Sequence, residues 1–303
     1  MNDDAITLRA RACLLGLAVG DAVGTTVEFS RRGTFEPVTD MVGGGPFRLN
    51  AGEWTDDTSM ALCLAESLVE CGGFDPTDQM ERYCRWWRNG HLSANGRCFD
   101  IGNTVSSALR RFEESGDPFA GSTSPDMAGN GSIMRLVAVP IFNRSNLAET
   151  IRLSRESSRT THGAEECLDA CHVLGALLHH LIAGASKDDA LEKLQAEELA
   201  SPRVQEIVAG SYRKKPEADI RSSGYVIHTL EAALWSFHRT TTFQDAILTA
   251  VNLGEDADTT GAVCGQIAGA FYGIEGMPGA WLERLAKRDL IESLASKLSG
   301  VAG

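Results

Sequence analysis

Long hydrophobic runs are missing from this sequence, although 43% of its 303 residues are hydrophobic. A membrane-spanning helix needs about 20 consecutive apolar residues, so a membrane protein is excluded. The longest candidate, residues 13–20, follows the acidic pair Asp3 and Asp4 and stops at Asp21. A secretory signal has a basic start and a cleavage site instead. We therefore expect a cytoplasmic protein.

Cys-x-x-Cys pairs are also absent among the eight cysteines. Scattered cysteines in a long chain without a signal peptide are typical of reduced thiols rather than of a disulfide framework. Cys167 and Cys171 lie four residues apart beside His172, a spacing that can place ligands on one helical face. A closed zinc site needs further ligands that the sequence does not offer. We expect these cysteines in the core.

Positive charge is scarce, because 28 Lys and Arg stand against 41 Asp and Glu, a formal net charge of −13. Such a chain repels phosphate backbones, so binding to nucleic acid through counterion release is not expected. An anionic small substrate would need a local source of positive charge. A bound cation would supply it.

Sustained alternation of apolar and polar residues is absent as well, which disfavours a strand-based fold. Helical periodicity dominates instead. It predicts helices over residues 6–19, 56–69, 77–87, 104–112, 147–157, 165–182, 188–194, 224–237, 243–251, 258–271 and 281–298. No proline-rich or low-complexity linker divides the chain, so we expect one compact all-α domain over residues 1–303, with long loops at about 29–54 and 116–130.

Glycine recurs every fourth residue at Gly261, Gly265, Gly269 and Gly273. In lipid this stripe marks helix dimerisation, but Gln266 and the short apolar length argue against a membrane span. The stripe predicts that a neighbouring helix approaches this one closely, despite a cost of roughly 1 kcal/mol for each helical glycine.

Two acidic clusters, Thr55–Thr58 and Asp256–Thr259, each have the pattern of a helix start with acids in the first turn. Together they offer carboxylates and threonine hydroxyls, the hard oxygen donors that Mg²⁺ and Mn²⁺ prefer. Four aspartates suit a two-metal site. Without cations they would repel one another, so either metals bind or the clusters never meet.

Four further features are ambiguous when each is taken alone. Glu28 follows a glycine-rich helix end, and taken alone it is expected to be a surface acid. Gly129–Ser132 precedes an apolar segment, so that its N–H groups could cradle a phosphate or form a plain turn. Phe99–Thr104 has the pattern of a loop entering a helix, with Asp100 or Asn103 as cap. His162, at a helix start, is more often structural than catalytic.

The motifs, taken in order, resemble those of the ADP-ribosylglycohydrolase family. They are residues 16–24 with Glu28, then 55–58, 129–135, 161–162 and 252–261. The resemblance covers about residues 6–275 and implies an orthogonal all-α domain with a binuclear Mg²⁺ or Mn²⁺ centre that removes ADP-ribose from a modified side chain. By matching position it implies the metal ligands Thr55, Asp56, Asp57, Asp256, Asp258 and Thr259.

The resemblance also assigns roles outside the metal ligands. Glu28 would lie beside the metals, and either Glu28 or a metal-bound carboxylate, Asp57 or Asp256, would take the proton from water. The implied substrate contacts are Gly129, Asn130, Gly131 and Ser132 to the distal ribose and diphosphate, His162 near the pyrophosphate, and Asn103 and Tyr225 in two further matching stretches.

Asp100–Thr104 and Ser222–Tyr225 are most similar to the branch named for dinitrogenase reductase-activating glycohydrolase, which acts on ADP-ribosylarginine. Asp100 would face the guanidinium, because a carboxylate binds that planar cation through two hydrogen bonds. Residues 124–128 depart from that branch, so the target protein stays open. Four alternatives also remain: serine-linked ADP-ribose, small ADP-ribosyl compounds, a non-catalytic binder, or an immunity protein that neutralises an ADP-ribosyltransferase toxin.

Overall fold

The computed structural model describes residues 3–194 and 196–301. Within these residues the chain forms helices and no strand, which confirms the all-α prediction. The α-helices are α1 Asp3–Gly24, α2 Asp56–Cys71, α3 Pro76–Asn89, α4 Asn103–Ser115, α5 Ala138–Phe142, α6 Leu147–Arg159, α7 Glu165–Ile182, α8 Lys187–Glu192, α9 Pro202–Val208, α10 Val226–Arg239, α11 Phe243–Val251, α12 Ala257–Tyr272, α13 Gly279–Arg284 and α14 Arg288–Val301.

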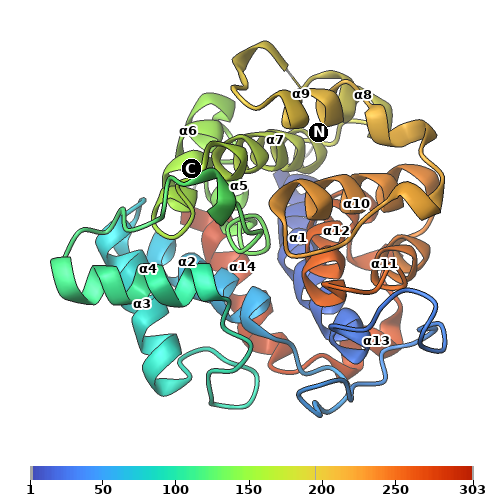
Figure 1. Cartoon of the computed structure of the whole chain (residues 1–303), viewed down its shortest axis with the longest axis horizontal. Helices are drawn as coiled ribbons and strands as arrows, with labels where there is room; N and C mark the ends of the chain where they lie inside the picture. Colours follow the sequence, from blue (N-terminus) through green and yellow to red (C-terminus); the bar gives the residue numbers. More distant parts are fainter. Residues whose placement is uncertain (1–2, 195, 302–303) are drawn as a thin grey trace.

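Helices α1 and α12 lie side by side at the centre of the molecule (Figure 1). Their contact is made by glycines from both helices: a Cβ atom built on Gly265 would lie 2.0 Å from the carbonyl oxygen of Gly16, and one built on Gly20 would lie 2.0 Å from that of Gly261. The predicted close approach is therefore confirmed. Gly273 is the exception, since it ends α12 with a φ of 72° and faces open space.

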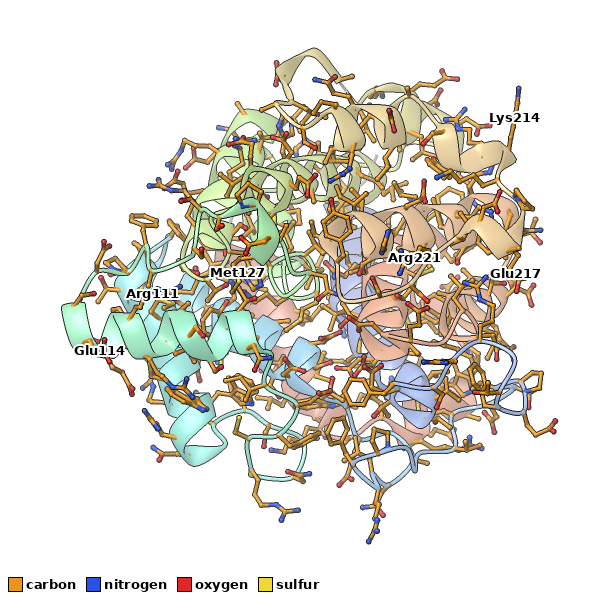
Figure 2. All side chains as sticks on the ribbon, viewed as in Figure 1. Arg111, Glu114, Met127, Lys214, Glu217 and Arg221 are labelled. Carbon is orange, nitrogen blue, oxygen red and sulfur yellow. The ribbon has the colours of Figure 1, made fainter. Side chains whose placement is uncertain are left out.

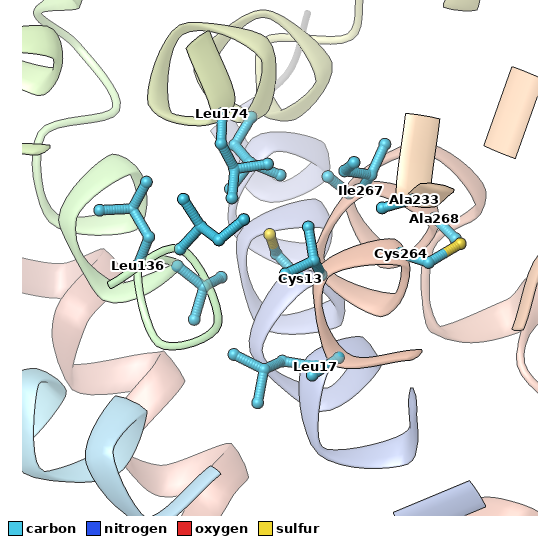
Figure 3. Close-up of a cluster of buried hydrophobic side chains, with 14 of the residues drawn as sticks. Cys13, Leu17, Leu136, Leu174, Ala233, Cys264, Ile267 and Ala268 are labelled. Atoms are coloured by element: carbon cyan, nitrogen blue, oxygen red, sulfur yellow. The ribbon is translucent and has the colours of Figure 1, made fainter. Parts of the chain in front are cut away.

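The main hydrophobic core surrounds this helix pair. Figure 3 shows Cys13 and Leu17 of α1 and Ile267 of α12 in one cluster with Leu174 of α7 and with Leu136 from the segment before α5. A smaller cluster lies between α2, α3 and α4. Charged side chains such as Glu114 and Lys214 point outward at opposite edges of the view (Figure 2).

The cysteines follow the prediction of reduced thiols. All eight are free, and five of them are buried. Cys167 and Cys171 belong to the main hydrophobic core on α7, as expected for core cysteines. The thiol of Cys167 also lies 3.3 Å from the carbonyl oxygen of Gly129, so that α7 contacts the glycine-rich loop.

Some predicted helix boundaries are wrong. The helix expected over residues 281–298 is two helices, α13 and α14, because the backbone between them forms hydrogen bonds with a distant segment of the chain. The N–H of Ala286 donates to Gly52 at 2.9 Å, the indole of Trp54 donates to the carbonyl of Ala286 at 3.0 Å, and Lys287 has a φ of 53°. The short helices α5 and α9, of 5 and 7 residues, were not predicted, since segments of this length show the helical period weakly.

No helix in residues 3–194 and 196–301 has both the length and the apolar character that crossing a bilayer requires.

Candidate active site

A cavity of about 390 Å³ opens where the first turns of α2, α4 and α12 meet the residues that follow α1. Most of the predicted site residues line it. They are Glu28, Asp56, Asp100, Asn103, Gly129, Asn130, Gly131, His162, Asp256, Asp258 and Thr259. Thr55, Asp57 and Ser132 are buried and lie outside the lining, and Tyr225 lines a neighbouring cavity.

The two acidic clusters meet, although about 200 residues separate them in the chain. The hydroxyl of Thr55 lies 3.3 Å from Oδ2 of Asp258, and the hydroxyl of Thr259 lies 3.3 Å from Oδ1 of Asp57. All four side chains are buried. The alternative in which the clusters never meet is thereby excluded.

Asp21 holds the first cluster in place, and the sequence assigned it no role. Its two carboxylate oxygens accept hydrogen bonds from both the backbone N–H and the hydroxyl of Thr55, each at 2.9 Å. They accept two more from Thr58, at 3.0 Å from N–H and 2.6 Å from the hydroxyl. Asp21 thus caps α2 from outside the helix. The signal available in the sequence was an acid ending the apolar run of residues 13–20.

This arrangement corrects the interpretation of Thr55 and Asp256 as ordinary caps, because neither side chain makes a capping hydrogen bond. At α12 the cap is Glu28, whose Oε2 accepts from the N–H of Ala257 at 2.8 Å and that of Asp258 at 3.3 Å. Glu28 is buried rather than a surface acid. A carboxylate at a helix N-terminus is favoured by the unpaired N–H groups and the helix dipole.

Buried carboxylates crowd the cavity. Burial raises the pKa of Glu28 to about 8, with the nearby charges of Asp256 and Asp100 adding to the shift. Burial likewise raises the pKa of Asp100 to about 7 and holds those of Asp56 and Asp258 well above the usual range. So much buried negative charge costs free energy unless protons or cations compensate it.

The donor set fits a divalent cation. Glu28, Asp256 and Asp258 each offer a carboxylate oxygen, and these oxygens lie within 4.8 Å of one another. In the first acidic cluster, Oδ2 of Asp57 is buried without a hydrogen-bond partner. A buried carboxylate oxygen without a donor is what a bound cation would satisfy.

The glycine-rich loop is tied to the acidic side of the cavity by Asn130. Its amide donates to Oδ2 of Asp256 at 2.8 Å and to the hydroxyl of Thr229 at 2.9 Å. On the other side the loop lies against His162: a Cβ built on Gly131 would come 2.7 Å from Cε1 of that ring. Glycine is therefore required where the loop passes the imidazole.

His162 is a neutral hydrogen-bond donor. Arg135, fully buried, donates to the hydroxyl of Thr161 at 2.8 Å, and that hydroxyl lies 2.8 Å from Nδ1 of His162. Arginine only donates, so the Thr161 oxygen accepts from Arg135. We assign the Thr161 proton to the hydrogen bond with Nδ1, which places the ring proton on Nε2. Burial, and then the charge of Arg135, lowers the pKa of His162 to about 3. Its N–H therefore faces the loop at Gly129.

Asp100 and Asn103 lie at the start of α4, but neither caps it. The N-cap position is occupied by Gly102, which has no side chain, and α4 itself begins at Asn103. The predicted capping role of Asp100 or Asn103 is therefore wrong. Asp100 instead has a left-handed backbone with a φ of 57°, and its carboxylate contributes to the cavity wall. Non-glycine residues adopt this conformation at a cost that the surrounding structure must support.

Tyr225 lines a second cavity of about 440 Å³ that shares Gly129 and Gly224 with the first. Its hydroxyl donates to Oε2 of Glu166 at 2.5 Å and accepts from Arg203 at 2.8 Å. The two cavities adjoin, so a ligand longer than the first can extend from the acidic clusters toward Tyr225.

A helical fold with two converging acidic clusters beside a glycine-rich loop defines a class of hydrolase site. The family model described as ADP-ribosylglycohydrolase matches residues 2–303, and the chain belongs to this family.

Two relatives and one solved structure are similar over nearly the whole chain. ADP-ribosylarginine hydrolase Tri1 of Serratia proteamaculans is 49% identical over 291 residues, which cover 96% of this chain and 78% of that protein. ADP-ribosyl-[dinitrogen reductase] glycohydrolase of Rhodospirillum rubrum is 34% identical, covering 94% and 92%. A solved ADP-ribosylglycohydrolase-related protein complex superimposes with a TM-score of 0.88 at 43% identity, covering 99% of this chain and 100% of the other.

Proposed function

We propose that this protein hydrolyses the N-glycosidic bond between ADP-ribose and an arginine side chain, releasing ADP-ribose and restoring the arginine. The observation that carries the proposal is the meeting of both acidic clusters with Glu28 and Asp100 in one cavity. The names of relatives at 49% and 50% identity, both ADP-ribosylarginine hydrolases, support the choice of arginine.

The proposal includes two divalent cations, Mg²⁺ or Mn²⁺. Their ligands would be Thr55, Asp56, Asp57, Asp256, Asp258 and Thr259. Bound there, they supply Lewis-acid chemistry that polarises water and sugar hydroxyls. The hydroxyl proton of Thr55 points to Asp21 in this proposal, which leaves the lone pairs of the oxygen available on its other side. The buried Oδ2 of Asp57 has no hydrogen-bond donor, so a cation would also compensate the charge of this oxygen.

The chemical step would use residues of the cavity wall. Water adds to the anomeric carbon, and the bond from that carbon to the arginine nitrogen breaks through a transition state with oxocarbenium character. The departing guanidine gains the proton that the water loses, so the step balances. Glu28 or Asp256 of the wall, or Asp57, which is buried outside the lining, takes the proton from the attacking water. Asp100 holds the guanidinium through two hydrogen bonds.

The ADP-ribose moiety would extend from the acidic clusters toward the second cavity. The N–H groups of the Gly129–Gly131 loop and the Nε2 proton of His162 are donors for ribose and diphosphate oxygens. Asn103 in the first cavity and Tyr225 in the second would also contact the substrate. Ser132 is buried outside the lining, so its contribution would be to the shape of the loop.

The substrate requires an arginine-specific ADP-ribosyltransferase to make it, and we propose such an enzyme as the partner of this chain in the modification cycle. We also propose a cytoplasmic site of action, where the eight free thiols stay reduced.

The test is incubation with a protein ADP-ribosylated on arginine, with Mg²⁺ or Mn²⁺ and with chelator. We expect ADP-ribose release that chelator abolishes and added metal restores. Asp56→Ala and Asp258→Ala should lose turnover, and Asp100→Ala should lose it selectively on arginine-linked substrate. Release that is unaffected by chelator would refute the metal assignment. A preference for serine-linked substrate would refute the linkage.

A further inference from the structure

Three phenylalanines form a cluster at the edge of the cavity. The rings of Phe29 and Phe47 lie 6.1 Å apart and edge to face, and those of Phe47 and Phe99 lie 5.4 Å apart. Phe29 is 65% exposed. Neither hydrophobic core includes any of the three rings or has them packed against it. Phe47 and Phe99 are half-buried. This aromatic trio therefore contributes little to the core, and its partly exposed apolar surface needs another explanation.

The fold holds Phe47 in place at the tip of a tight turn. Gly44 and Leu49 close this turn with two backbone hydrogen bonds, of 2.8 and 2.9 Å. The hydroxyl of Thr26 donates to the carbonyl of Gly43 at 3.0 Å and ties the turn to the chain just before Glu28. Phe47 is thus presented beside the active site by a hydrogen-bonded scaffold.

Phe29 and Phe99 are each next to a proposed catalytic residue in the sequence. Phe29 follows Glu28, has a left-handed φ of 62°, and donates its N–H to the carbonyl of Glu255 at 2.7 Å. Phe99 precedes Asp100, which is left-handed too. A phenylalanine adopts a positive φ only when the structure enforces it, so this conformation holds the ring at the cavity wall rather than in the core.

The trio lies on the arginine side of the proposed substrate. Phe29 and Asp100 both line the first cavity, and neither lines the second one, where Tyr225 lies. The two loops that carry the trio run along the lower edge of the molecule in Figure 1. With ADP-ribose extending from the acidic clusters toward Tyr225, the arginine and the polypeptide that bears it leave the cavity past the three rings.

We propose that the aromatic trio is the docking surface for the polypeptide around the modified arginine, and that it favours apolar side chains next to that arginine. The inference rests on the proposed function. Aromatic rings bury large apolar area with little loss of conformational freedom, which makes them effective anchors at interfaces.

The test compares three substrates: ADP-ribosylated free arginine, and two peptides in which the modified arginine is flanked by leucines or by serines. The wild-type protein should prefer the leucine peptide. Phe47→Ala should lower kcat/KM on that peptide by on the order of tenfold, mainly through KM, as for the loss of an interface anchor. Its rate on free ADP-ribosylarginine should stay close to that of wild type, because Phe47 does not line the cavity.

Leu8→Ala is the matched control, since Leu8 is 51% exposed on α1 and does not line the cavity. It should leave all three rates unchanged. Phe47→Leu keeps an apolar side chain and separates a loss of docking from a loss of folding: it should retain part of the preference, with an unchanged melting temperature.

The remaining outcomes count against either the docking role or the proposed function. Equal losses for Phe47→Ala on the leucine peptide and on free ADP-ribosylarginine would overturn the docking role, as would a wild-type protein without preference between the peptides. A Phe47→Ala protein that changes only its oligomeric state would show that the trio binds a second copy of the chain instead. No hydrolysis of any substrate by wild type would refute the proposed function itself.

Discussion

Asp21 accepts two hydrogen bonds from Thr55, one from the backbone N–H and one from the hydroxyl, both at 2.9 Å. Seven positions after Asp21 in the chain, Glu28 accepts hydrogen bonds from the N–H groups of Ala257 and Asp258. The first helix and the turn after it therefore anchor both acidic clusters. Glycine contacts lock that helix against α12, so the relative position of the clusters follows from backbone packing.

Replacing Asp21 by asparagine should weaken metal binding. The amide NH₂ would face the N–H groups that now donate to Asp21, so at least one buried hydrogen bond is lost, at a cost of about 1–3 kcal/mol. We expect a lower melting temperature and a Mn²⁺ affinity reduced by on the order of tenfold, measured by calorimetry. Asp117→Asn, at an exposed site, controls for the lost charge. Wild-type affinity in Asp21→Asn would contradict the anchoring role.

Metal removal should make stability depend on pH in a specific direction. In the metal-free protein the pKa values of Asp21, Asp100 and Glu28 are raised, to about 6, 7 and 8. The folded state then binds more protons than the unfolded state between about pH 4 and 8, so the free energy of unfolding falls as pH rises through this range.

Thermal unfolding with chelator and with Mn²⁺ checks this. Cations replace the protons, so the gain in melting temperature on adding Mn²⁺ should be larger at pH 8 than at pH 5. An equal gain at the two pH values would count against cation binding among these carboxylates.

Gly265→Ala should destabilise the protein through the central helix contact. Its Cβ would lie 2.0 Å from the carbonyl oxygen of Gly16, a backbone atom that cannot rotate away. Overpacking of this kind costs about 1–3 kcal/mol or more, which exceeds the gain of about 1 kcal/mol in helix propensity. Urea unfolding measures the loss. Gly300→Ala, in α14 with nothing near its Cβ, should be neutral or slightly stabilising.

His162→Gln should change the acid stability of the protein. In the folded state the pKa of His162 is lowered to about 3, whereas in the unfolded chain it is about 6.5. The histidine therefore contributes stability that is present above about pH 6.5 and is lost as pH falls toward 3. Glutamine does not titrate, so the stability difference between the two proteins should shrink from pH 7.5 to pH 5 in urea unfolding. A constant difference would show that His162 becomes protonated in the folded protein.

The helices could be predicted because long segments carry the 3.6-residue period of one buried face. The break between α13 and α14 could not, since it depends on hydrogen bonds of Ala286 with Gly52 and Trp54, more than 200 positions away. The glycine stripe of α12 predicted a close neighbour but did not identify it as α1.

The sequence by itself determined the types of donor atom in the site and their order along the chain, because carboxylates, hydroxyls and glycines have chemistry that does not depend on the fold. Only the tertiary structure decided that Thr55–Thr58 and Asp256–Thr259 meet, and that Asp21 and Glu28 cap the two helices that carry them. Local patterns show that a helix start needs an acceptor. Which carboxylate accepts is decided by packing between distant segments, and so is the gathering of exposed Phe29 with half-buried Phe47 and Phe99.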